Sequence, residues 1–80
     1  MELRGIPLWL VREYLEEAGG RARDDTHVAG NGWTATLEQI EDFTLGSLRI
    51  GQVRLTLEGD PDAVARLREF LEPKLLRAGG

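Results

Sequence analysis

Two arginines, Arg49 and Arg54, are the residues best suited to chemistry in this sequence. Guanidinium groups bind phosphate and carboxylate oxygens through paired hydrogen bonds. We expect the two side chains to lie directly opposite each other on the solvent face of a sheet. Like charges across a strand pair are destabilising, so something must neutralise them. Glu38 is the favoured internal partner, and a partner protein or a specific phosphate site are the alternatives.

The same predicted face carries the hydroxyl groups of Thr34 and Thr36. Together with the two arginines and Glu38, they form the interaction surface that the sequence predicts. Trp9 is a further candidate, because it falls among the charged residues of a predicted helix. An exposed indole there is either a partner contact or packs over Ile6 or the chain end, and the packing interpretation is favoured.

His27 lies close in sequence to two carboxylates, Asp24 and Asp25. A hairpin turn at residues 31–32 sets Asp25 opposite Glu38 and His27 opposite Thr36. Three convergent ligands would suit a metal ion, but this spacing is irregular and the sequence fixes no nucleophile beside His27. We therefore predict no metal site, no cofactor and no catalytic residues.

Two glycine motifs have plain structural interpretations. The segment GNGW lacks the GxGxxG pattern of a phosphate loop and predicts a hairpin turn followed by a core tryptophan. The terminal Gly79-Gly80 resembles the tails of ubiquitin-like sulfur carriers, which are activated at the C-terminal carboxylate. Here the pair follows a predicted helix, so a frayed helix end is favoured over a carrier function.

Residues 30–59 predict two consecutive β-hairpins that position these side chains. Asn31-Gly32 predicts a type I′ turn. The resulting register places one set of side chains on the inner face and another on the outer face. The inner set is Val28, Trp33, Ala35 and Leu37, and the outer set is His27, Thr34, Thr36 and Glu38.

The second hairpin is predicted from a change in the numbering of the apolar residues. Leu48 and Ile50 have even numbers, whereas Val53, Leu55 and Leu57 have odd numbers. Because successive side chains point to opposite faces of a strand, one regular strand cannot place all five on one side. A two-residue type II′ turn at Gly51-Gln52 would solve this, and so would a glycine bulge in one long strand. The hairpin is favoured.

Helices flank these strands. Pro7 and Gly19-Gly20 delimit a helix over about residues 7–18. Asp60 caps a second helix, which Pro73 should end or kink near Leu71, with KLLR as one possible further turn. The fold class is α+β, a four-stranded antiparallel curved sheet with both helices on one face, in the order α-β-β-β-β-α with a possible short leading strand over residues 1–6.

Composition limits the class of protein. Eighty residues form a single domain, and 41% hydrophobic with 30% charged residues indicates a globular chain. The absence of cysteine excludes disulfides and thiolate chemistry, and the net charge of −4 disfavours nucleic acid as the main partner. The first residues contain no signal-peptide pattern, so we expect a cytoplasmic protein with no membrane contact.

Several segments carry a family resemblance: RGIPLWLVREYLEEAGG, GNGW, LGSLRIGQVRLTLEGD and KLLRAGG. They are similar to the C-terminal domain of a Thermus-type MoaD-related protein, a relative of the small subunit of molybdopterin synthase. The resemblance implies a TATA-binding-protein-like fold in a family of unknown function.

These observations predict a binding or interaction module, not an enzyme. Its expected partner is a protein or a second copy of itself, bound through the open sheet face around Arg49 and Arg54. The resemblance alone implies a pathway near molybdenum-cofactor or sulfur-carrier chemistry. The alternatives are a carrier activated at Gly80 and an anion- or nucleic-acid-binding sheet.

Overall fold

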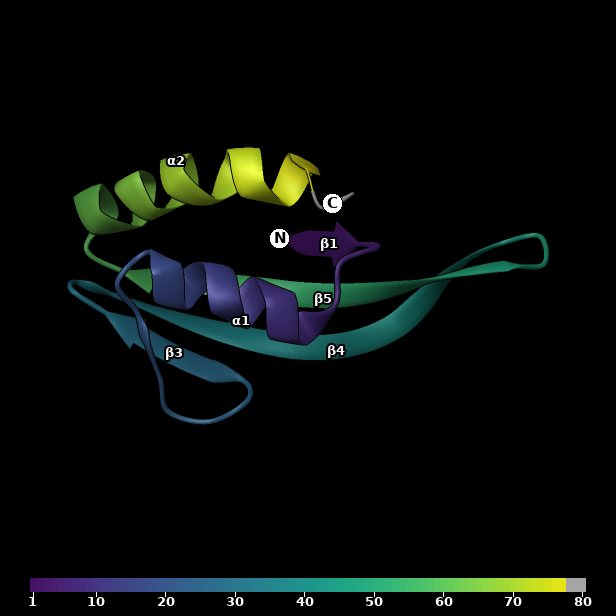
Figure 1. The fold of residues 1–80 in the computed structure, drawn as a ribbon, viewed down its shortest axis with the longest axis horizontal. Coiled ribbons are helices and arrows are strands. Elements are labelled where there is room, and N and C mark those ends of the chain that lie inside the picture. Colours follow the sequence, from purple (N-terminus) through teal and green to yellow (C-terminus); the bar gives the residue numbers. More distant parts are fainter. Residues whose placement is uncertain (78–80) are drawn as a thin grey trace.

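The computed structural model describes residues 1–77. Its elements follow the chain as β1 (Glu2–Arg4), α1 (Leu8–Glu17), β2 (Arg21–Ala22), β3 (His27–Gly30), β4 (Trp33–Leu45), β5 (Leu48–Gly59) and α2 (Pro61–Arg77). The strands form one antiparallel sheet in the order β1-β5-β4-β3-β2. Both helices lie on the same side of it (Figure 1). The predicted α+β class and the one-sided helices are confirmed.

The possible leading strand forms and gives the sheet a fifth strand. β1 pairs with β5, with Leu3 opposite Val53. The ammonium group of Met1 donates a hydrogen bond to the carbonyl oxygen of Leu55 at 2.7 Å. Leu3 and Ile6 are buried, so burial of two apolar side chains supports a strand whose local sequence signal is weak.

The first helix lies where the sequence predicts it. Pro7 has the extended conformation of an N-cap residue. Gly19, with φ 98°, has the left-handed backbone conformation that ends the helix. Val11 and Leu15 are fully buried on the face of α1 that packs against the sheet.

The turn at Asn31-Gly32 is in the predicted place, but its predicted type is wrong. A type I′ turn needs positive φ at both central residues, and here only Gly32 has one, at 85°. A negative φ followed by a positive φ is the type II pattern. The Gly32 carbonyl also accepts a hydrogen bond from the Asp60 N–H at 2.9 Å, which ties this turn to the start of α2.

The predicted turn at Gly51-Gln52 is wrong, because β5 runs unbroken through both residues. The chain reverses instead at Gly46-Ser47, where Leu45 pairs with Leu48 and Gly46 has φ 62°. A bulge does exist at the level of Gly51, but the extra residue is in the neighbouring strand.

In that bulge, Ile40 pairs with Gln52 and Phe43 pairs with Ile50. Glu41 and Asp42 of β4 therefore share one position opposite Gly51. This is the two-against-one arrangement of a β-bulge.

The second helix begins as predicted, and KLLR continues it for the possible further turn. The Asp60 carboxylate accepts the Ala63 N–H at 3.0 Å. An end near Leu71 is wrong, because α2 continues through Pro73 to Arg77. An internal proline costs about 3 kcal/mol, and burial of one leucine contributes about 1.5–3 kcal/mol. Leu75, 5% exposed, therefore offsets much of the cost of the extra turn.

The core lies between the helices and one face of the sheet. The four residues predicted for the inner face of the first hairpin are all buried there. They pack with β5 and both helices, and the main partners are Val53, Leu55, Leu15, Leu67 and Leu71. Among residues 1–77 there is no helix long and apolar enough to cross a membrane.

The packing of Trp33 predicts opposite outcomes for two glycine substitutions. A Cβ at Gly30 would overlap the Trp33 ring, whereas a Cβ at Gly51 meets nothing within 4 Å. We expect Gly30→Ala to lower the free energy of unfolding by about 1–3 kcal/mol through overpacking. Gly51→Ala should leave it unchanged or raise it by up to about 1 kcal/mol. Urea unfolding of both variants checks this, and equal effects would contradict the packing described.

Candidate interaction surface

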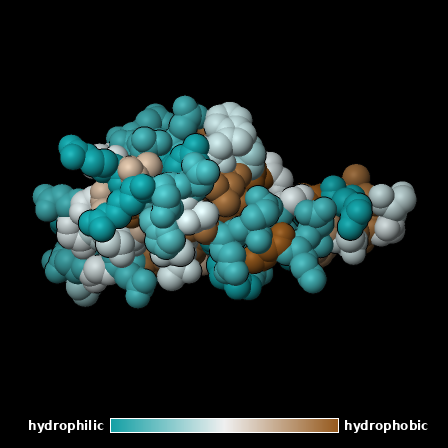
Figure 2. Space-filling view, turned by 90° about the horizontal axis from the view of Figure 1, so that it is seen from below, coloured by the Kyte–Doolittle hydropathy of each residue, from teal (hydrophilic) through white to brown (hydrophobic). Residues whose placement is uncertain are grey.

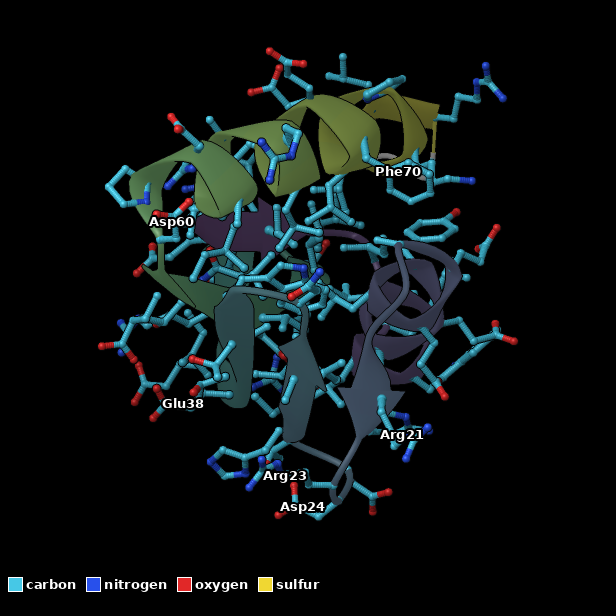
Figure 3. All side chains as sticks on the ribbon, turned by 90° about the vertical axis from the view of Figure 1, so that its left-hand side faces the viewer. Arg21, Arg23, Asp24, Glu38, Asp60 and Phe70 are labelled. Carbon is cyan, nitrogen blue, oxygen red and sulfur yellow. The ribbon has the colours of Figure 1, made fainter. Side chains whose placement is uncertain are left out.

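The sheet surface that faces away from the helices is here called the open face. The strand register places Glu38 opposite Arg54 and Thr36 opposite Thr56, with Thr34 one step further along β4. Figure 3 shows Glu38 on the side of the sheet away from α2. The structure therefore brings together four of the predicted surface residues: Thr34, Thr36, Glu38 and Arg54.

Arg54 is neutralised within the molecule, as the favoured interpretation holds. Its guanidinium donates to Glu2 Oε2 at 3.1 Å and to Glu38 Oε1 at 3.3 Å. The hydrogen bond that Arg54 donates to Glu2 and the negative charge of Glu38 raise the pKa of Arg54. The pair with Glu38 was predicted, whereas Glu2 joins only because β1 adds to the edge of β5.

Arg49 is not opposite Arg54, and that prediction is wrong. The two arginines lie on the same strand, where Arg49 pairs with Thr44. Its side chain alternates with Leu48 and Ile50 and so projects from the opposite surface. The guanidinium lies 3.9 Å from Asp42 and is 76% exposed. The error follows from the turn at Gly51, because only a reversal there could bring the two residues face to face.

Trp9 is also separate from this group. It is 55% exposed on α1, in the helical layer on the other side of the sheet. The predicted surface is thus divided among the open face, the reverse side of β5 and the first helix.

The end of the β4–β5 hairpin carries the main apolar feature outside the core. Residues 41–51, here called the arm, extend beyond β1 and β3, which pair with β5 only at residues 52–54 and with β4 only at residues 33–36. Figure 1 shows the arm projecting past both helices, and Figure 2 shows hydrophobic atoms at its tip and where it joins the body.

The open face of the arm and its base is apolar. The guanidinium of Arg4 stacks over the Phe43 ring at 3.9 Å, and Arg4 pairs with Gln52 on the side that holds the Arg54 cluster. Phe43 is therefore on the open face. Its neighbours in register share that face, which gives the set Ile40, Phe43, Leu45, Leu48 and Ile50.

The bulge causes this arrangement. The extra residue at Glu41–Asp42 reverses which residues of β4 face the helices. Phe43 and Leu45 therefore join Ile40 on the open face, although Trp33 and Leu37, of the same parity, are in the core. Leu45 and Leu48 are 66% and 56% exposed.

At the other end of the open face lies a hollow of about 430 Å³. Its floor includes Ala29, Thr34 and Thr36, and its rim includes Arg23 and His27. The floor side chains are small, so the surface is depressed between the rim and the Arg54 cluster.

Asp24 fixes the loop that forms the rim (Figure 3). Its carboxylate accepts the Thr26 N–H at 2.8 Å and lies 3.0 Å from His27 Nδ1. The backbone hydrogen bond from Thr26, followed by the contact with His27, lowers the pKa of Asp24 to about 2. This is an Asx turn, in which an aspartate replaces backbone partners.

The predicted convergence of acidic residues on His27 is only partly present. His27 pairs with Thr36 as expected, but Asp25 is not opposite Glu38, because β3 begins only at His27. Asp25 lies in the loop and accepts Arg12 at 3.3 Å. Within residues 1–77 no group of three or more His, Asp and Glu side chains could hold a metal ion. The Gly79-Gly80 pair lies outside the described residues.

Residues 1–80 match the family model described as Archaeal MoaD-like protein. The chain belongs to this family. Its match extends over the whole sequence, and the MoaD-related resemblance seen in the sequence is confirmed at this level. Comparison with curated proteins gave no match.

The apolar residues of the arm are the part of this surface that sequence reasoning missed. The signal was present, because the parity of the apolar residues changes near Gly51 in β5 and again between Leu37 and Ile40 in β4. The change near Gly51 alone predicts a turn or a bulge that keeps a single apolar face, and the change in β4 has no such interpretation. They instead mark the level at which the apolar side of the hairpin moves from the core to the open face.

The position of Asp24 predicts a change of stability with pH. Its pKa is lower in the folded chain than the 3.8 of an ordinary aspartate. Its stabilising contribution is therefore complete above about pH 4 and is lost as the pH falls towards 2. We expect Asp24→Asn to lower the melting temperature at pH 7, and the difference from wild type to shrink between pH 4 and pH 2.

Thermal melts across this pH range test the prediction. Glu13→Gln is a suitable control, since among residues 1–77 the Glu13 side chain has no hydrogen bond or ion pair. A difference between Asp24→Asn and wild type that stays constant down to pH 2 would contradict the role of the carboxylate charge.

Proposed function

We propose that this chain is a protein-interaction module, not an enzyme, and that it binds its partner through the open face with the arm as the main contact. One observation carries the proposal. Five apolar side chains occupy one side of a projecting hairpin that neither helix covers.

The energetic cost of leaving these side chains in water supports a partner. Burial of a leucine, isoleucine or phenylalanine side chain contributes about 1.5–3 kcal/mol. The side chains of Leu45 and Leu48 are each more than half exposed to solvent. Single exposed leucines are common on protein surfaces, but a contiguous apolar cluster rimmed by polar residues is typical of an interaction site.

The charges around the arm also support a protein partner over an anion. Arg54 already has two carboxylate partners, and Arg49 lies 3.9 Å from Asp42. Binding to a phosphate backbone depends on uncompensated cations. A partner that meets this surface gains more from the apolar arm than from the arginines.

Family membership adds a wider part to the proposal. The module is accessory to molybdenum-cofactor or sulfur-carrier chemistry, and the description of its family as MoaD-like is the support for that assignment.

Capture from an extract of the source organism tests the proposal. The double variant Leu45→Ser/Leu48→Ser removes the apolar tip, and Leu76→Ser is the matched control, because Leu76 is 74% exposed on α2. We expect the immobilised wild type and the control to retain the same protein, and the arm variant to retain at least tenfold less. Equal retention by all three would contradict the role of the arm.

A further inference from the structure

We propose that the partner on the open face is a second copy of this chain, packed face to face about a two-fold axis so that each arm tip fills the hollow of the other copy. This inference rests on the proposed function and specifies its partner. It is argued from three features of the open face: a knob and a hollow at opposite ends, complementary charges between them, and the area of the face.

The knob and the hollow lie at opposite ends of the same two strands. The exposed tip is the pair Leu45 and Leu48. The hollow lies over β3 and β4 at Ala29, Thr34 and Thr36, and Thr34 is at the level of Glu58 on β5. Consider a two-fold axis that lies between the two packed faces and runs across the strands at the level of residue 53, between Gln52 and Arg54. This axis exchanges the two levels, because residues 48 and 58 are equally far from residue 53. Each copy then places an apolar tip over the small residues of the other copy's hollow.

The same axis brings opposite charges together. Arg4 lies at the level of Gln52 and is not in an ion pair with any described carboxylate. At the next level, Arg54 with Glu2 and Glu38 forms a cluster with one excess negative charge. Rotation about the axis sets Arg4 of each copy against the acidic cluster of the other. Complementary charges of this kind fix the register of an interface.

The area of the open face fits a dimer. A stable interface takes about 800 Å² from each partner. The arm alone, two strands of about six residues, offers roughly 200 Å² in outline. The whole molecule measures 42 × 24 × 18 Å. Because the arm is only two strands wide, the outline of the full open face stays below about 1,000 Å². Only a partner that covers the whole face reaches the required area, and a second copy presents a face of equal length.

Both sheet faces are twisted antiparallel surfaces, which pack in aligned pairs about 10 Å apart. In this arrangement the Ile50 and Phe43 pair of one copy meets the Thr36 and Thr56 pair of the other. The methyl groups of the threonines give the apolar side chains a partly apolar contact. Such an interface is isologous and closes at two subunits.

Sedimentation equilibrium tests the subunit number. We expect the wild type to dimerise at micromolar to tens of micromolar concentration. Leu45→Asp/Leu48→Asp should raise the dissociation constant at least 100-fold, and Leu76→Asp should leave it within threefold. Circular dichroism checks that each variant is folded, and all three positions are exposed. A wild type that is monomeric at 1 mM, or a dimer that the arm variant leaves intact, would overturn the inference.

Cross-linking tests the arrangement itself. The chain has no cysteine, so single-cysteine variants react only where the residue is introduced. A tagged Leu48→Cys chain mixed with an untagged Thr34→Cys chain should be joined by a bismaleimide that spans about 10 Å, the spacing of packed sheets. Leu76→Cys mixed with Thr34→Cys is the control and should not be joined. Joining of the control pair alone would overturn the face-to-face arrangement.

These outcomes separate the inference from the proposed function. A monomeric wild type whose arm still retains a different protein from the extract overturns the second copy as partner and leaves the interaction module standing. A dimer that the arm variant disrupts, and that joins residue 48 to residue 34, supports both.

Discussion

The pairing of β4 with β5 is the constraint on which the rest of this structure depends. It runs from Trp33 opposite Gly59 to Leu45 opposite Leu48 and is interrupted once. β3 can add only to the outer edge of β4, and β1 only to the outer edge of β5. The helices then cover the half of the hairpin that these short strands widen into a sheet. The position of the core and the extent of the arm both follow from this one pairing.

The single interruption decides what each half of the hairpin does. Side chains alternate between the two faces of a strand, so one extra residue moves every later side chain to the other face. On the side of the bulge nearer the helices, the apolar residues of both strands, apart from Ile40, face the helices and form the core. Towards the tip of the arm, the apolar residues face away from the helices. The bulge also places Glu41 and Asp42 at the edge of β4, beyond Leu37, whose N–H bonds to Thr26. Charges and a bulge at an edge discourage edge-to-edge pairing, which agrees with the proposed binding through the open face.

Much of the fold could be predicted because its signals are local. The turn at Asn31-Gly32 and the cap at Asp60 each depend on a few neighbouring residues. The alternation from Val28 to Leu37 also reports a real inner face. The errors have a different origin. Whether Gly51 is a turn, a bulge or a regular strand residue depends on what lies opposite it in β4, ten residues away. The contact of Glu2 with Arg54 spans 52 residues, and no local pattern contains it. The predicted opposition of Arg49 and Arg54 therefore failed through one wrong turn, while the pairing of Glu38 with Arg54 survived because Glu38 remains opposite Arg54 in the observed register.

The open face combines two kinds of contact, and neither defines a partner alone. Apolar side chains supply most of the free energy of association, but they pack almost as well when two sheets shift by one pleat. Exposed ion pairs add little affinity, yet they penalise registers in which like charges meet. On this face the apolar cluster and the Arg54 cluster lie at adjacent levels of the same strands, joined by Arg4, which stacks on Phe43 and reaches Gln52 at 3.1 Å. In the proposed complex, a partner that buries the arm must therefore also satisfy the charges beside it, and this requirement makes the binding selective although the arm is apolar.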